Sequence, residues 1–376
     1  MLRRRQAAGE KHGAVGLLRM TAAAAVIAAG CLCLPARASA PSVKVLTDRA
    51  SAAAAAAGRT CARMGEAYAT PEMRVTAIDF GQAEYPGDVI LVSSGGRYLL
   101  MDTGLPDNVE DPDGCMTIRW LKDSGISDLD LYLSHYHDDH YFLMCTILED
   151  AFFHVGRIYL PDVETLLTYS DPAYMWEAWY GSLTKNLSLS GSWGENARSA
   201  ILADAEELGV PVTTLTQGDS FPLGFSNVEI LWQETDPVPE GDNATDAINR
   251  TSLVARVTGG GCRYLTGGDM YVSNEQHMLE AGVDVQADIF KLSHHGGETS
   301  NDPAFLQATG ARYAILEDYP HRQLASPKSE KAVAAAREAG MTVMSPRRHG
   351  TFTYVCRGGE ITVLGGERNR EEWEGR

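Results

Sequence analysis

Four side chains of the types that bind metal ions fall within six positions of the sequence: His135, His137, Asp139 and His140. They follow an apolar stretch, residues 129–133, that predicts a strand. Residues i and i+2 of a strand face the same side, so His135 and His137 should project together. Imidazole and carboxylate groups at this density suit zinc, iron or manganese. Because burying such a cluster without a counter-charge would cost several kcal/mol, we expect a metal site here and not a set of core histidines.

A second metal position is expected beside the first. The sequence after the cluster predicts a helix over residues 139–150, whose first turn offers Asp139 and His140. Two metal ions about 3.5 to 4 Å apart are a common arrangement in hydrolytic sites, where they activate water and stabilise negative charge. The pattern therefore predicts metal-assisted hydrolysis.

The spacing His-x-His-x-Asp-His resembles the signature of the metallo-β-lactamase superfamily, and residues 135–140 match it without a gap. Later stretches, residues 249–254, 264–269 and 290–297, narrow the resemblance to the metallo-β-lactamase domain of bacterial competence (DNA-uptake) proteins. That branch is similar to secreted phosphorylcholine esterases. The resemblance covers about residues 73–365 and implies an α/β fold. The expected architecture is the metallo-β-lactamase αββα sandwich, in which two mixed sheets are flanked by helices.

The resemblance also implies roles for residues outside the cluster. Asp269 follows two glycines at the end of a predicted strand and would bridge both metals, and His294 is assigned to the second metal. His295 would bind substrate or deliver a proton, but adjacent strand residues face opposite sides, so which of the two imidazoles ligates is open. Asp102, at the end of the predicted strand 97–101, would orient the histidines. The expected metal ligands are His135, His137, Asp139, His140, Asp269 and His294, and the expected catalytic residues are Asp139, His295 and Asp102.

One ligand of the superfamily has no counterpart in this chain. Most members carry a further histidine several dozen residues after the first cluster, yet no histidine occurs between His154 and His277. His154 lies too soon after the cluster and is expected to be structural. The first metal is then one ligand short unless Asn249, water or substrate completes it. We expect one or two Zn2+ ions, with Mn2+ or Fe as alternatives.

The amino terminus has the features of an export signal. Five basic residues precede the apolar stretch 21–34, which is followed by Ala36-Arg37-Ala38 and Ala38-Ser39-Ala40. Fourteen apolar residues are too few to span a bilayer comfortably. Ala28-Ala29-Gly30-Cys31 also resembles a lipoprotein cleavage box, in which case Cys31 would carry a lipid anchor to the membrane. We expect an extracytoplasmic protein, either secreted or lipid-anchored at the cell envelope.

Composition favours one large catalytic domain with appendages in this chain of 376 residues. We expect a signal over residues 1–40, a linker over 41–72, the metallo-β-lactamase-like domain over 73–366 and a charged tail over 367–376. An aromatic-rich insertion at about 161–208 either packs against the domain or forms a wall of the substrate cleft. Further strands are predicted over residues 75–80, 88–92, 155–160 and 287–293, and a further helix over residues 329–340.

The charge of the chain bears on its substrate. Removing residues 1–40 takes away six basic residues and one acidic residue, which changes the formal net charge from −18 to −23. A broad nucleic-acid-binding surface is therefore not expected. We expect a phosphodiesterase or phosphoesterase acting on a small phosphoester or an envelope polymer; the alternatives are a lactone, ester or β-lactam hydrolase, or an extracellular nuclease. Disulfide pairing among the five remaining cysteines and the oligomeric state stay open.

Overall fold

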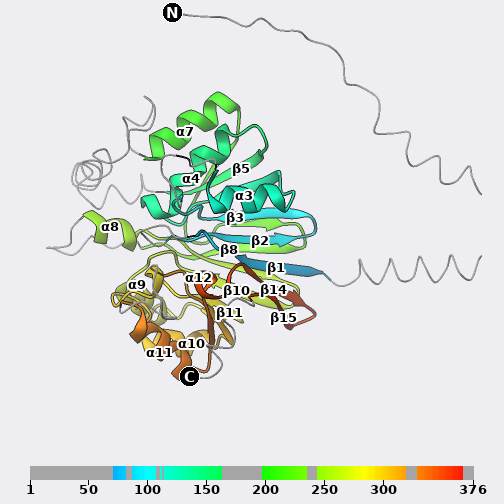
Figure 1. Cartoon of the computed structure of the whole chain (residues 1–376). Coiled ribbons are helices and arrows are strands. Elements are labelled where there is room, and N and C mark those ends of the chain that lie inside the picture. Colours follow the sequence, from blue (N-terminus) through cyan, green and yellow to red (C-terminus); the bar gives the residue numbers. More distant parts are fainter. Residues whose placement is uncertain are drawn as a thin grey trace, which may run out of the picture. The chain divides into compact units, whose positions relative to one another are not determined.

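Two mixed β-sheets pack face to face at the centre of the fold (Figure 1). The structure is a computed structural model, and it describes residues 71–81, 87–106, 111, 114–162, 197–234, 244–318 and 328–366. The predicted signal, most of the linker, residues 163–196 of the aromatic insertion and the charged tail lie outside the described residues. All the described residues belong to one unit of the chain, Tyr68–Arg376.

The first sheet has eight strands in the order β15-β14-β1-β2-β3-β4-β5-β6. Its strands pair antiparallel from β15 to β3 and parallel from β3 to β6. Their bounds are β1 (Glu72–Ala77), β2 (Ile90–Ser94), β3 (Arg97–Met101), β4 (Asp128–Tyr132), β5 (His154–Pro161), β6 (Val212–Leu215), β14 (Phe352–Arg357) and β15 (Glu360–Gly365).

The second sheet has seven strands in the order β13-β12-β11-β10-β9-β8-β7. Its strands pair antiparallel from β7 to β10 and parallel from β10 to β13. Their bounds are β7 (Ser220–Leu223), β8 (Ser226–Trp232), β9 (Val254–Gly259), β10 (Cys262–Thr266), β11 (Ile289–Lys291), β12 (Tyr313–Ile315) and β13 (Thr342–Met344).

Helices cover the outer faces of both sheets (Figure 1). The first sheet packs against α3 (Met116–Asp123), α4 (Asp138–Glu149) and α7 (Ala197–Leu208). The second sheet packs against α9 (Val272–Glu280), α10 (Pro303–Thr309) and α11 (Glu330–Glu338). Three further short helices are α8 (Ala244–Arg250), η2 (His294–Gly296) and α12 (Pro346–His349).

Side chains that point alternately to the two faces of each strand produce these layers. In β3, Leu100 packs under the helices while Leu99 and Met101 pack between the sheets. In β10, Leu265 faces the second helical layer and Tyr264 faces the first sheet. Successive strand residues face opposite sides, so each sheet must be covered on both faces. The helix–sheet–sheet–helix order confirms the predicted fold class.

Most predicted elements are present with shifted ends. The strand over 97–101 is found without change, and the helix predicted over 139–150 is α4. The strand predicted over 287–293 is wrong at its end, because β11 stops at Lys291, before both histidines. Among the helices of the described residues, none combines the length and apolar character needed to cross a membrane.

Candidate metal centre

The candidate metal ligands lie in the segments that follow three strands, with Asp139 and His140 in the first turn of α4. His135 and His137 follow β4, Asp269 follows β10, and His295 follows β11. β4 lies in the parallel half of the first sheet, and β10 and β11 lie in the parallel half of the second. Polar side chains at the carboxyl ends of parallel strands meet at one edge, where α/β proteins commonly bind ligands.

The first donor group consists of His135, His137 and Asp269, whose ligand atoms lie within 4.8 Å of one another. The two imidazole rings are 4.7 Å apart. The sequence suggested that the two rings meet because both histidines lie on one strand. In the structure, however, β4 ends at Tyr132 and residues 134–136 form a bend. That part of the prediction is wrong, because the chain must turn at this point to begin α4, and the turn itself brings the two rings together.

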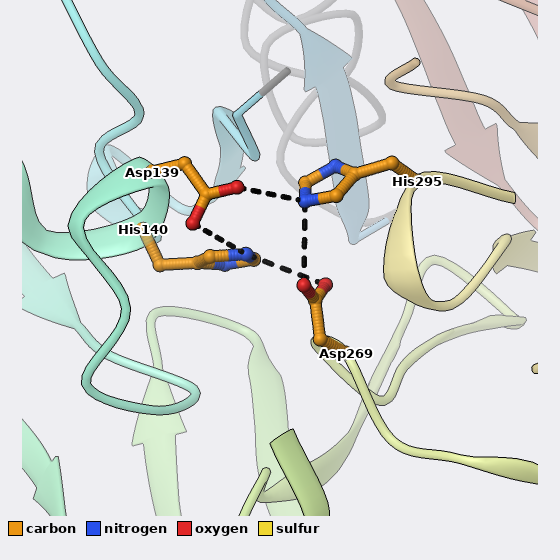
Figure 2. A group of neighbouring side chains, drawn as sticks. All are labelled: Asp139, His140, Asp269 and His295. Atoms are coloured by element: carbon orange, nitrogen blue, oxygen red, sulfur yellow. Dashed lines mark ion pairs between the residues drawn. The ribbon is translucent and has the colours of Figure 1, made fainter. Parts of the chain in front are cut away.

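The second donor group consists of Asp139, His140, Asp269 and His295 (Figure 2). Nε2 of His295 lies 3.1 Å from Oδ2 of Asp139 and 3.3 Å from Oδ2 of Asp269. Nε2 of His140 lies 3.3 Å from Oδ1 of Asp269 and 3.8 Å from Oδ1 of Asp139. Asp269 thus faces His140 with one oxygen and His295 with the other, and it belongs to both groups.

The bridging position of Asp269 depends on a tight backbone approach. Gly268 has a φ of +52°, and a Cβ atom added to it would lie 2.6 Å from Oγ of Ser134. Only glycine fits here without strain. The two glycines before Asp269 therefore let the loop after β10 pass directly beside the histidine cluster.

Unpartnered polar atoms show that the donor groups fit metal ions. Among the described residues, five buried ligand atoms make no hydrogen bond: Nε2 of His135, His137, His140 and His295, and Oδ1 of Asp269. Buried polar atoms are normally paired, and a convergent set without partners calls for an ion. Imidazoles together with carboxylates suit Zn, Fe or Mn. The residues present therefore fit a pair of metal ions that share Asp269.

A hydrogen-bonded support fixes the histidines on the side away from this centre. Asp102 accepts hydrogen bonds from the backbone amide and the hydroxyl of Ser134, both at 2.7 Å. Oδ2 of Asp102 lies 2.8 Å from Nδ1 of His140, and Oγ of Ser134 lies 3.0 Å from Nδ1 of His135. Such contacts at Nδ1 leave Nε2 free to face a metal. Asp102 is thus placed to orient histidines and not to bind the ion with them.

Three buried charged residues near the site were not assigned roles from the sequence: Asp88, Lys291 and Glu317. Lys291 is fully buried, contacts the Asp88 carboxylate, donates to the backbone oxygen of Gly268 at 3.0 Å, and lies 3.8 Å from Oδ1 of Asp269. Glu317 accepts a hydrogen bond from the backbone amide of Val89 at 2.9 Å. A lysine inside the apolar strand β11 was the one signal that could have revealed this network.

The network carries an internal cation. Burial opposes the charged form of Lys291, but Asp88, Asp269 and Glu317 outweigh it and raise its pKa. Burial alone would raise the pKa of Asp88, yet Lys291 and two histidines lower it to about 2. Lys291 is therefore an ammonium group that balances part of the negative charge beneath the metal centre.

The imidazoles of the centre differ in their affinity for protons. Burial and the nearby His140 lower the pKa of His135 well below its usual value, and burial lowers the pKa of His137 to about 4. Burial also opposes protonation of His140 and His295, but the surrounding carboxylates, Asp269 foremost, raise both pKa values well above the usual range. Without a metal, protons on His140 and His295 balance the carboxylates, so a metal ion must displace them on binding.

The two neighbouring histidines after β11 occupy different places from those assigned. His295, and not His294, lies in the second donor group with Asp139 and His140. Nδ1 of His295 lies 2.9 Å from the backbone oxygen of Glu317. His294 lies on another side of Asp269, with Nε2 4.0 Å from Oδ2 of that residue. This geometry therefore favours His295, and not His294, as a ligand of the second metal.

Two further expectations concern residues outside the centre. His154, expected to be structural, is the exposed first residue of β5. No disulfide joins the four cysteines of the described residues, Cys115, Cys145, Cys262 and Cys356, all of which are buried.

Comparison with known proteins bears out the expected resemblance to competence proteins, whereas the expected link to phosphorylcholine esterases stays a prediction. No family model matches the chain. The chain is 23% identical over 194 residues to the ComE operon protein 3 of Bacillus subtilis, an alignment that covers 50% of this chain and 24% of that protein. The chain thus spans about a quarter of the curated relative that it matches.

Solved structures match the chain at low similarity. The metallo-β-lactamase fold protein YhfI of Bacillus subtilis matches with a TM-score of 0.42 and 14% identity, over 73% of this chain and 95% of that one. CmlA, a diiron β-hydroxylase from Streptomyces venezuelae, matches with a TM-score of 0.43 and 14% identity, over 78% of this chain and 54% of that one. At this level of similarity neither protein bears on the reaction or the metal of this chain.

Proposed function

We propose that this chain is an exported metal-dependent hydrolase that cleaves phosphoesters, with small phosphodiesters as the preferred class. The observation that carries the proposal is the pair of donor groups that share Asp269, with five buried ligand atoms that make no hydrogen bond within the described residues. When bound at such a site, a metal pair lowers the pKa of water toward neutrality and stabilises negative charge on a phosphoryl oxygen.

The protein's own residues would bind and orient the reacting groups. His135, His137 and Asp269 would hold one ion, and Asp139, His140 and His295 would hold the other together with Asp269. Asp102 fixes the ring of His140 through Nδ1, and the backbone oxygen of Glu317 fixes that of His295. Histidines held in this way would keep bound metal ions in fixed positions, and preorganised charge is usually the largest contribution that such a site makes to rate.

The charge of the chain supports a small substrate. Residues 41–376 carry a formal net charge of −23, so a long polyanion is repelled at a distance. A singly charged or zwitterionic diester is repelled far less, and the metal ions attract it at contact. Similarity to a competence-operon protein agrees with a role at the cell envelope, where envelope polymers offer such diesters.

A substrate panel on the zinc-loaded protein tests the proposal. We expect turnover of bis(4-nitrophenyl) phosphate or 4-nitrophenyl phosphorylcholine, and slower turnover of single-stranded DNA, a lactone and nitrocefin. Asp269→Asn should abolish turnover, whereas Asp284→Asn, a change in an exposed ion pair with Arg256, should leave it intact. Hydrolysis of the lactone or nitrocefin without the diesters would instead identify the acyl-transfer alternative.

Export is tested separately. The signal features predict a mature amino terminus near Ser39 or Pro41, or a lipid-modified Cys31. Mass spectrometry of the protein from its native cell should find one of these ends. Intact Met1 on protein from the cytoplasm would contradict export without affecting the proposed chemistry.

A further inference from the structure

We infer that His294 supplies the third imidazole of the first metal position, beside His135 and His137, in place of the histidine that this chain lacks. The inference rests on the metal centre proposed above, but it concerns which ion each histidine binds and not which substrate is cleaved.

The backbone after β11 makes this arrangement feasible. His294 and His295 have φ values of +50° and +52°, in the left-handed region that bulky residues rarely adopt. In an extended strand, two adjacent side chains would face opposite sides. Here two successive left-handed residues turn both imidazoles toward Asp269, with their ring centres 6.2 Å apart. Strain of this kind persists at functional sites where the surroundings hold it in place.

The surroundings of this turn hold it firmly. The backbone amide of Ser293 donates to Oδ1 of Asn301 at 2.9 Å, and Nδ2 of Asn301 donates to the backbone oxygen of Ser293 at 2.9 Å. The amide of His294 donates to the backbone oxygen of Gly268 at 3.1 Å. The turn is therefore tied directly to the loop that carries Asp269.

Distances to Asp269 and Asp139 distinguish His294 from His295. Nε2 of His135 lies 3.9 Å from Oδ2 of Asp269, and Nε2 of His294 lies 4.0 Å from the same oxygen. Ligands bound to a tetrahedral zinc ion at about 2.0 to 2.1 Å are about 3.4 Å apart, so a small contraction would bring both nitrogens onto one ion. Nε2 of His295 lies 3.3 Å from Oδ2 of Asp269 as well, but its 3.1 Å approach to Asp139 places it in the second donor group.

The hydrogen bonds of His294 fix its tautomer, with Nε2 unprotonated and in a contact with Asn249 that a bound ion would replace. Tyr271 donates its hydroxyl hydrogen to Asp246 at 2.6 Å, so its oxygen must accept from Nδ2 of Asn249 at 3.0 Å. This fixes the amide with its nitrogen toward His294, where Nδ2 lies 3.5 Å from Nε2. Nε2 then faces a donor and must be unprotonated, so Nδ1 carries the hydrogen and donates to Oγ1 of Thr299 at 2.6 Å. Metal-binding histidines commonly show this pattern, with one nitrogen held by an acceptor and the other unprotonated.

The inference is tested by counting bound zinc in matched variants of the full chain. His294→Gly and His295→Gly each remove an imidazole without straining the backbone, because glycine adopts a positive φ freely. Zinc is measured by mass spectrometry after dialysis against a fixed free Zn2+ concentration. His137→Ala marks the loss of the first ion, and Asp139→Ala marks the loss of the second.

We expect His294→Gly to lose the same ion as His137→Ala. The double variant His137→Ala/His294→Gly should then hold as much zinc as His137→Ala alone, whereas Asp139→Ala/His294→Gly should lose the ion that Asp139→Ala retains. If His294→Gly instead lowers the zinc content of the His137→Ala variant but not that of the Asp139→Ala variant, His294 belongs to the second ion and the inference is overturned. Zinc content unchanged by His294→Gly would overturn it as well. Because zinc content is independent of turnover, failure here is distinguishable from failure of the proposed phosphoesterase activity.

Discussion

Replacing Lys291 with methionine should destabilise the metal-free protein far more than a surface lysine replacement does. Methionine keeps most of the aliphatic length of lysine and removes its charge. Lys291 is fully buried and is the cation that contacts Asp88 and lies 3.8 Å from Asp269. Removing it leaves these carboxylates facing each other in an interior that water does not reach.

The magnitude follows from the cost of breaking a buried ion pair. Removing one partner of such a pair typically costs about 3 to 5 kcal/mol, because the remaining charge stays buried without compensation. An exposed pair contributes at most about 1 kcal/mol. The chain offers a matched control in Lys331, which is 77% exposed and lies 2.8 Å from Glu298. We therefore expect Lys291→Met to lower the free energy of unfolding by about 3 kcal/mol or more and Lys331→Met by less than about 1 kcal/mol.

Urea unfolding of chelator-treated protein, followed by circular dichroism, measures both values. Adding Zn2+ should recover part of the loss in Lys291→Met, because bound metal supplies positive charge to Asp269 from the other side. If Lys291→Met costs no more than Lys331→Met, the carboxylates do not need an internal cation and the electrostatic account of the network is wrong.

Three further predictions concern pH, metal affinity and salt. Burial raises the pKa of Glu275 to about 7, although the amides of Asn301 and Asp302 oppose the shift. Because the folded state then binds this proton more tightly than the unfolded state, the free energy of unfolding should fall by up to about 3 kcal/mol between pH 4.5 and 7. Urea titrations of Glu275→Gln should lack this pH dependence. Asp102→Ala should weaken zinc binding about 10- to 100-fold in a chelator competition, because His140 loses the partner that orients it; unchanged affinity would remove Asp102 from this role. Hydrolysis of a small diester should exceed that of DNA at low ionic strength, and salt up to about 0.2 M should leave the DNA reaction unchanged or faster; a DNA reaction that is faster at low salt and collapses with added salt would reveal a basic groove.

Local patterns in the sequence were sufficient for much of the fold. The apolar run at residues 97–101, directly after the Gly95-Gly96 turn, predicted β3; the run is continuous because Leu99 and Leu100 face different apolar layers. The spacing of the His135–His140 cluster predicted converging donors, because all four side chains lie within six positions. Two glycines before Asp269 indicated a close backbone approach, and Gly268 shows that approach beside Ser134.

The remainder of the centre depends on information that local patterns do not contain. The strand expected to extend to residue 293 ends at Lys291, because tertiary hydrogen bonds hold His294 and His295 in left-handed conformations that oppose their intrinsic preference. Asp88 and Lys291 lie on strands of different sheets or beside them, so no local spacing links them. The sequence shows a charge in an apolar strand, but only the packing of the two sheets shows its partner.

Anomalous X-ray diffraction at the zinc edge, from crystals of the zinc-loaded protein, shows whether two metal ions share Asp269. We expect two peaks about 3.5 to 4 Å apart that flank the Asp269 carboxylate. One peak should lie beside His135 and His137, and the other beside His140 and His295. A single peak, or peaks away from Asp269, would contradict the shared metal centre.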